Sequence, residues 1–135
     1  MSKKEIWFHG TSASSANAIL KSRKFKTGEP INGANFGKGV YLTNCENYAK
    51  TYGDTVIEVE VDMDSILDLP LKQYSEICKE INGHWLTTPL SGKQMEELTR
   101  KNGKIGVVQE REIRDTTKKM CIHEQDTIKI IGIRK

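Results

Sequence analysis

The sequence predicts an α+β protein whose core is a mostly antiparallel β-sheet. Segments with strand and helix periodicity alternate through the first half of the chain, and the C-terminal part returns to strands after two successive helices. The chain has 135 residues, which suffice for one hydrophobic core but not for two. It contains no internal repeat, low-complexity tract or linker. We therefore expect a single domain that spans residues 1–135.

The first half of the chain supplies three predicted strands and two predicted helices. The apolar run at residues 5–9 predicts a short strand, and the alternation of apolar and acidic residues at 55–62 predicts a half-exposed strand. Residues 12–25 begin with a serine and repeat apolar residues on one side, as a helix does. The other elements of this half are a glycine-rich loop, a strand and two helical turns, at residues 26–39, 40–43 and 45–53.

The second half of the chain predicts two helices followed by strands. The helices at residues 71–83 and 91–103 each end in an Asn-Gly pair, which is a common signal for a helix C-terminus. The strands follow at residues 104–110, 119–125 and 127–133.

Composition and charge narrow the range of partners. The 21 basic and 18 acidic residues give a net charge of +3, which is too small to indicate nucleic-acid binding by itself. The sequence has no apolar run of signal-peptide length and none that approaches the length of a membrane span. We therefore expect a cytoplasmic protein with no membrane partner.

The three cysteines predict neither a disulfide nor a metal site. Cys45, Cys78 and Cys121 are odd in number and show no paired spacing, and no histidine lies at a metal-ligand interval from any of them. We expect reduced, buried thiols and no metal ion.

Two short motifs carry the chemical signal of this sequence. The first is "IWFHGTS" at residues 6–12, in which an apolar strand ends on His9, a glycine and two hydroxyl residues. The second is "FGKGVYLT" at residues 36–43, in which two glycines flank a lysine just before the strand that carries Tyr41. The spacing of this second motif differs from that of a P-loop, and the chain has no G-x-G-x-x-G sequence, so phosphate cradles of those two kinds are excluded.

Together the two motifs resemble the ADP-ribosyltransferase superfamily, in its histidine-tyrosine-glutamate branch. That branch includes the poly-ADP-ribose polymerases and many small bacterial and phage transferases. In this branch one strand ends in His-Gly-Thr or His-Gly-Ser, and a later strand carries Phe-Gly-x-Gly-x-Tyr; the chain has both in that order. The segments at 46–53 and 121–132 also resemble a short helix and the closing strands of the family. The resemblance implies a mostly antiparallel split β-sheet core with short flanking helices, and it leaves about residues 70–100 without a counterpart.

The resemblance implies NAD as co-substrate, in a cleft formed by three parts of the chain. His9 would bond a hydroxyl of the adenosine-side ribose, and the Gly10 backbone would pair with the nicotinamide carboxamide, where a side chain would block the approach. Tyr41 and Tyr48 would enclose the nicotinamide ring. Thr11 or Ser12 would donate to the ribose or to a phosphate oxygen, or else stabilise the turn. The cleft would be completed by the glycine-rich motif, at Phe36, Gly37 and Gly39.

The catalytic carboxylate is where the sequence departs from the polymerase pattern. Cleavage of the glycosidic bond builds positive charge on the ribose, so a nearby carboxylate stabilises the transition state. Where the polymerases begin the closing strand with an acid, this chain has Lys118 and Lys119. The nearest acids are Glu110 and Glu112, which resemble the Gln-x-Glu and Glu-x-Glu loops of other transferase branches. Because residues two apart in a strand share a face, we expect both glutamates to reach the cleft, in catalytic roles beside His9 and Tyr41.

Three functions fit the sequence. The first is a mono-ADP-ribosyltransferase that moves ADP-ribose from NAD to a macromolecule, because a lysine at the polymerase glutamate position argues against chain elongation. The second is a non-catalytic binding or inhibitor module on the same NAD-binding fold. The third is an unrelated small α+β protein. For the transferase we expect a protein acceptor rather than nucleic acid, and a phage or bacterial effector or toxin that acts on host machinery or defence.

Overall fold

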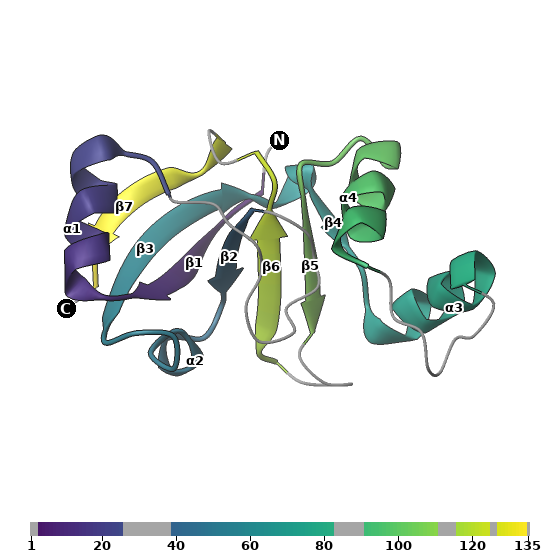
Figure 1. The fold of residues 1–135 in the computed structure, drawn as a ribbon, viewed down its shortest axis with the longest axis horizontal. Helices are drawn as coiled ribbons and strands as arrows, with labels where there is room; N and C mark the ends of the chain where they lie inside the picture. Colours follow the sequence, from purple (N-terminus) through teal and green to yellow (C-terminus); the bar gives the residue numbers. More distant parts are fainter. Residues whose placement is uncertain (1–2, 26–38, 83–90, 111–115, 125–126, 135) are drawn as a thin grey trace.

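The protein folds around one seven-stranded sheet. The computed structural model describes residues 3–25, 39–82, 91–110, 116–124 and 127–134. The strands are β1 (Lys4–Thr11), β2 (Val40–Thr43), β3 (Thr55–Asp62), β4 (Ile66–Asp68), β5 (Gly106–Glu110), β6 (Lys118–Ile122) and β7 (Lys129–Ile133). They lie in the order β4-β5-β6-β2-β1-β3-β7, and all neighbours are antiparallel except β4 and β5. The predicted α+β class with a mostly antiparallel sheet is confirmed (Figure 1).

The helices are short and have recognisable ends. They are α1 (Ala13–Ser22), α2 (Glu46–Ala49), the 3-10 turn η1 (Met63–Ser65), α3 (Leu71–Asn82) and α4 (Gly92–Lys101). Ser91 and Gln94 form a capping box at the start of α4, in which each side chain bonds the backbone N–H of the other residue. Arg23 ends α1 in the left-handed conformation, with φ of 60°, and its N–H donates to the Ile19 carbonyl at 2.7 Å. Among the helices that the structure describes, none is both long and apolar enough to cross a membrane.

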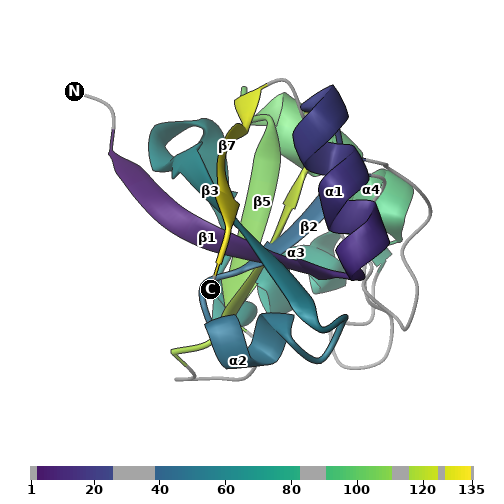
Figure 2. The same ribbon diagram turned by 90° about the vertical axis from the view of Figure 1, so that its left-hand side faces the viewer.

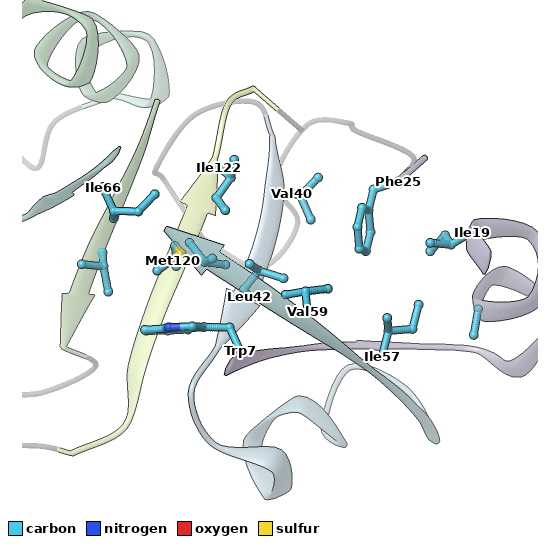
Figure 3. Close-up of a cluster of buried hydrophobic side chains, with 13 residues drawn as sticks. Trp7, Ile19, Phe25, Val40, Leu42, Ile57, Val59, Ile66, Met120 and Ile122 are labelled. Carbon is cyan, nitrogen blue, oxygen red and sulfur yellow. The ribbon is translucent and has the colours of Figure 1, made fainter. Parts of the chain in front are cut away.

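Two hydrophobic clusters cover opposite faces of the sheet. Successive strand residues point to opposite faces, and Met120 and Cys121 accordingly belong to different clusters. The larger cluster contains Trp7, Ile57 and side chains of α1 (Figure 3). The smaller cluster joins the sheet to α3 and α4, through Leu69, Cys78, Met95, Val107 and Cys121. Helices therefore pack on both faces, with α1 against the larger cluster and α3 and α4 against the smaller one, while Ile6 of β1 and Ile131 of β7 stay exposed.

The pairing between β1 and β2 is much shorter than the pairing on the other side of β1. β1 is registered with β3 along its whole length, from Lys4 opposite Asp62 to Thr11 opposite Thr55. Its register with β2 is a single pair, Phe8 opposite Thr43. The strands β1 and β2 therefore meet at one point and separate beyond it. Helix α2 lies beside both strands there (Figures 1 and 2).

The free thiols agree with expectation at two positions. Cys78 and Cys121 are buried and unbridged, whereas Cys45, also unbridged, is half-buried. Strand β4 was not predicted, because three residues are too few to show a period of two. It is found through its parallel pairing with β5, which lies about forty residues further along the chain.

Candidate functional site

His9 lies where β1 and β2 separate, and its ring is held on two sides. Its Nδ1 lies 2.9 Å from the carbonyl oxygen of Tyr41, so Nδ1 carries the proton and donates it to this bond. The ring of Phe25 meets the imidazole edge to face, with centroids 5.0 Å apart. In the neutral ring these contacts leave Nε2 as a hydrogen-bond acceptor.

Burial keeps His9 neutral. It lowers the pKa of the imidazole below its ordinary value of 6.5, and the hydrogen bond to the Tyr41 carbonyl opposes this shift without cancelling it. At neutral pH the side chain therefore presents an uncharged acceptor. Such a group suits a ligand hydroxyl, which can donate to it.

An aromatic pocket of ≈ 90 Å³ lies on one side of His9. Most of its wall comes from β1, from β2 and from the segment around α2, with one residue from β6. Its lining residues are Phe8, His9, Gly10, Tyr41, Leu42, Thr43, Tyr48, Tyr52 and Lys119. Three tyrosines and a phenylalanine make this "aromatic pocket" suited to a flat ring. The structure thus brings together His9, Gly10, Tyr41 and Tyr48 as the sequence predicted.

A larger and more polar groove of ≈ 460 Å³ lies beside α1, and His9 lines this groove as well. The other lining residues are Thr11, Ser15, Ala18, Ile19, Ser22, Lys24 and Phe25. Hydroxyl groups and a lysine are suitable partners for ribose hydroxyls and phosphate oxygens. His9 therefore lines both the aromatic pocket and this "hydroxyl groove", and a ligand that occupied both would pass beside His9.

The hydroxyl residues that follow His9 divide into two roles. Thr11 lines the hydroxyl groove. Ser12 is the N-cap of α1, and its side chain accepts a hydrogen bond from the Ser15 N–H at 3.2 Å. The turn-stabilising alternative for Ser12 is thus the contact that the structure shows. The cap sets the direction in which α1 leaves β1, and so it shapes the groove.

Gly10 is required by packing. A Cβ added at Gly10 would overlap the backbone carbonyl of Ala49 in α2, and one added at Gly53 would overlap the backbone of Thr11. The sequence attributed the bare backbone at Gly10 to a ligand, but the neighbour seen in the structure is the helix that carries Tyr48. Gly39 behaves similarly, since a Cβ there would overlap the Ile122 carbonyl of β6.

Tyr48 and Tyr52 form a pair at the edge of the aromatic pocket. Their rings meet edge to face at 5.5 Å, and the Tyr52 hydroxyl donates to that of Tyr48 at 3.1 Å. Burial, followed by this bond to Tyr48, raises the pKa of Tyr52 to about 12. Tyr52 is still 54% exposed. Tyr52 was not predicted as a site residue, although its spacing of four residues from Tyr48 could have indicated it.

Tyr41 links the aromatic pocket to the smaller cluster. Its side chain packs against that cluster and hydrogen-bonds the thiol of Cys121. Burial raises the pKa of this thiol to about 12, although the bond to Tyr41 acts in the opposite direction. At neutral pH Cys121 is therefore a protonated thiol, unsuited to act as a nucleophile. The same thiol lies 3.7 Å from the Nδ1 of His123.

Of the two glutamates predicted for the cleft, the structure describes Glu110, which lies outside the aromatic pocket. Glu110 accepts a hydrogen bond from the Leu71 N–H at 3.2 Å, at the start of α3, and does not line the pocket. Gln109, expected to face away from the cleft, donates to the Leu69 carbonyl at 3.2 Å. Glu110 thus contacts the start of α3, and its catalytic role stays a prediction. Glu112, Phe36 and Gly37 lie outside the described residues.

Lys119 is one of the two lysines at the place where the family resemblance implies an acid. It is paired with Thr43 of β2 and Gln109 of β5, and it lines the aromatic pocket. The pocket-lining residues that the structure describes include no carboxylate. Among all the residues that the structure describes, no group of three or more His, Cys, Asp or Glu side chains could hold a metal ion.

Comparison with known proteins adds a family match over the first half of the chain. A model of the poly(ADP-ribose) polymerase catalytic domain matches residues 1–67. This match supports the resemblance to the ADP-ribosyltransferase superfamily. The matched span includes His9, Gly10, Tyr41 and Tyr48, and it ends before β5 and β6, where Glu110 and Lys119 lie.

Two further comparisons add little. No curated protein matches the sequence. A solved structure titled "Crystal structure of an anti-CRISPR protein" is 16% identical with a TM-score of 0.47, over 96% of this chain and 97% of that one. A similarity of this size carries no argument about function.

The lowered pKa of His9 predicts a pH-dependent stability. Between pH 6.5 and the lower native pKa, the unfolded chain binds more protons than the folded chain, so the free energy of unfolding falls as the pH falls. Urea unfolding of the wild type at about pH 7.5 and about pH 5.5 should show this loss, and the His9→Gln variant should show a smaller one. Equal losses in both proteins would mean that His9 is not the group responsible.

The packing of Gly10 against α2 predicts a costly substitution. Gly10→Ala should lower the free energy of unfolding by about 1–3 kcal/mol, because the added methyl group must displace α2 or β1. Asn17→Ala, at an exposed position of α1, is a matched control that should change it by less than about 0.5 kcal/mol. Similar values for the two variants would show that α2 does not need the bare backbone.

Proposed function

We propose that this chain is a mono-ADP-ribosyltransferase that uses NAD and releases nicotinamide. The observation that carries the proposal is the position of His9, a neutral acceptor between an aromatic pocket and a hydroxyl-lined groove. The polymerase-type family match covers the residues of this arrangement except Lys119, and it is the second support. We assign an ADP-ribosyltransferase-like fold to the chain on the same grounds.

The described residues fit the two halves of NAD. The nicotinamide ring would occupy the aromatic pocket between Tyr41 and Tyr48, where each stacked pair adds about 0.5–1.5 kcal/mol beyond area burial. The Nε2 atom of His9 would accept from a ribose hydroxyl, and the hydroxyl groove would hold the adenosine half. The pocket of ≈ 90 Å³ is smaller than the roughly 150 Å³ cavity that accommodates benzene, so movement of a side chain would let the ring enter more deeply. The exposed Tyr52 is the side chain best placed to move.

The reaction needs a carboxylate as well as a binding site. Departure of nicotinamide leaves positive charge on the ribose, and a negative group nearby lowers the barrier. We assign this role to Glu112, because Glu110 is engaged with the start of α3. The acceptor proposed is a protein, since the net charge of +3 gives little attraction for a nucleic acid. A role as a phage or bacterial effector stays a prediction.

Nicotinamide release in the presence of a bacterial lysate tests the assignment. Glu112→Gln should lower turnover about a hundredfold with NAD affinity nearly unchanged, because the carboxylate acts chiefly in the transition state. His9→Ala and Tyr41→Ala should instead weaken NAD binding, measured by calorimetry. Glu110→Gln is the matched control and should retain turnover. Full activity of Glu110→Gln, of Glu112→Gln and of the double variant would contradict the proposal, because neither glutamate would then be the catalytic carboxylate.

A second candidate function is a binding module that retains NAD without cleaving it. The observation that favours it is Lys119, an ammonium group in the wall of a pocket whose described residues include no acid. Positive charge at this place opposes the charge that develops on the ribose.

Replacement of Lys119 separates the two candidates. The nicotinamide ring of NAD is itself a cation, so Lys119→Gln should raise NAD affinity about threefold to tenfold in either case. In a transferase it should also raise the rate of nicotinamide release, whereas in a binding module release should stay absent. Lys118→Gln is the control, because Lys118 neighbours Lys119 in β6 but does not line the pocket. Equal effects of the two substitutions would count against a specific role for Lys119.

A further inference from the structure

One arginine far from the family motifs connects three elements around the aromatic pocket. Arg134 follows β7, and its Nε donates to Glu46 at 3.0 Å, while its Nη1 donates to Glu58. The guanidinium carbon lies 5.6 Å from the centre of the Phe8 ring, over its face. Glu46 is the first residue of α2, Glu58 lies on β3, and Phe8 lines the aromatic pocket.

We infer that Arg134 is a positioning residue that fixes α2, and with it the tyrosine wall of the aromatic pocket. The inference deepens the proposed function and rests on it for the choice of ligand. It concerns the shape of the pocket rather than contact with the reacting atoms.

Helix α2 depends on contacts from outside itself. It has four residues, and its N-cap residue Cys45 makes no side-chain capping bond. A helix this short is unstable on its own, so tertiary contacts must hold it. The contacts described above are the close approach of Gly10 to Ala49 and the bond from Arg134 to Glu46. Tyr48 lies within this helix and Tyr52 just after it, so both tyrosines follow its position.

Arg134 also ties together the two parts of the sheet that separate at the pocket. Its backbone N–H donates to the Val56 carbonyl of β3 at 2.7 Å, so its own position is set by the β1-β3-β7 part. Helix α2 follows β2, which belongs to the other part. The guanidinium thus spans the separation at which Phe8 and Thr43 form the single registered pair. Exposed ion pairs usually contribute little to stability. The guanidinium of Arg134, however, bonds two carboxylates and stacks on an aromatic ring, and these contacts together define its geometry.

A lysine cannot reproduce this arrangement. The planar guanidinium offers donors in fixed directions to Glu46 and Glu58 while its face covers Phe8, whereas an ammonium group is a point charge without a face. Lys50 also lies 3.9 Å from Glu46, but that pair is internal to the α2 segment and does not anchor it to β3.

The test compares Arg134→Gln and Arg134→Lys with a control arginine. Arg100→Gln is matched, because Arg100 pairs with Glu96 at 4.0 Å within α4 and does not line the pocket. Two quantities are measured: NAD affinity by calorimetry, and hydrogen exchange of the Lys50 amide, which bonds the Glu46 carbonyl at 3.1 Å. Both Arg134 variants should bind NAD about fivefold to tenfold more weakly and exchange this amide faster. Arg100→Gln should change neither quantity.

A double variant identifies the path of the effect. Glu46→Gln alone should weaken NAD binding as much as Arg134→Gln does. The double variant should bind NAD no more weakly than either single variant, because both substitutions remove one shared contact. A fall in melting temperature without either change would overturn the inference and leave Arg134 a purely structural residue. If the wild type does not bind NAD, the proposed function fails. Hydrogen exchange at α2 then still decides whether Arg134 holds the helix.

Discussion

The hydrogen bond from the Nδ1 of His9 to the carbonyl oxygen of Tyr41 spans the place where β1 and β2 part. It fixes the tautomer of the imidazole, leaves Nε2 as an acceptor, and joins the residue of the first motif to that of the second. Burial, which lowers the pKa, keeps the ring uncharged. The rest of the site depends on this bond, because the aromatic pocket and the hydroxyl groove both have His9 in their walls.

Close packing of the backbone is the second constraint on the shape of the candidate site. Gly10 allows α2 to approach β1, and α2 carries the tyrosine that forms part of the pocket wall. Ser12 caps α1 and so begins the helix that lines the groove. The His-Gly-Thr-Ser run is thus explained residue by residue: an acceptor, a close approach, a groove hydroxyl and a helix cap. The strand β1 ends at Thr11, and Ser12 then begins the capped helix α1.

The sequence placed His9, Gly10, Tyr41 and Tyr48 in one candidate site, and the structure brings these residues together, because the signals for this half of the site are local. The glycine, hydroxyl and aromatic residues lie in short motifs, and the strands around them show clear periodicity. The acid was harder to place. Alternation along β5 suggested that Glu110 would face the cleft, yet the residue that it bonds, Leu71, lies 39 positions away and came near only on folding. Arg134 reaches Glu46 across 88 positions, and no local pattern indicates such a contact. The sequence places Lys118 and Lys119 where the resemblance implies an acid. That Lys119 lines the pocket follows only from the pairing of β6 with β2.

The proposed function depends most on the Nε2 of His9, which would accept a hydrogen bond from a hydroxyl of NAD. Nitrogen NMR of the protein with ¹⁵N-labelled histidine tests this bond most directly. On titration with NAD, the Nε2 resonance of His9 should shift with saturable dependence as it accepts a hydrogen bond, while Nδ1 keeps its proton and its bond to Tyr41. NAD binding that left both nitrogens of His9 unchanged would contradict the account, because the ligand would then lie elsewhere on the protein.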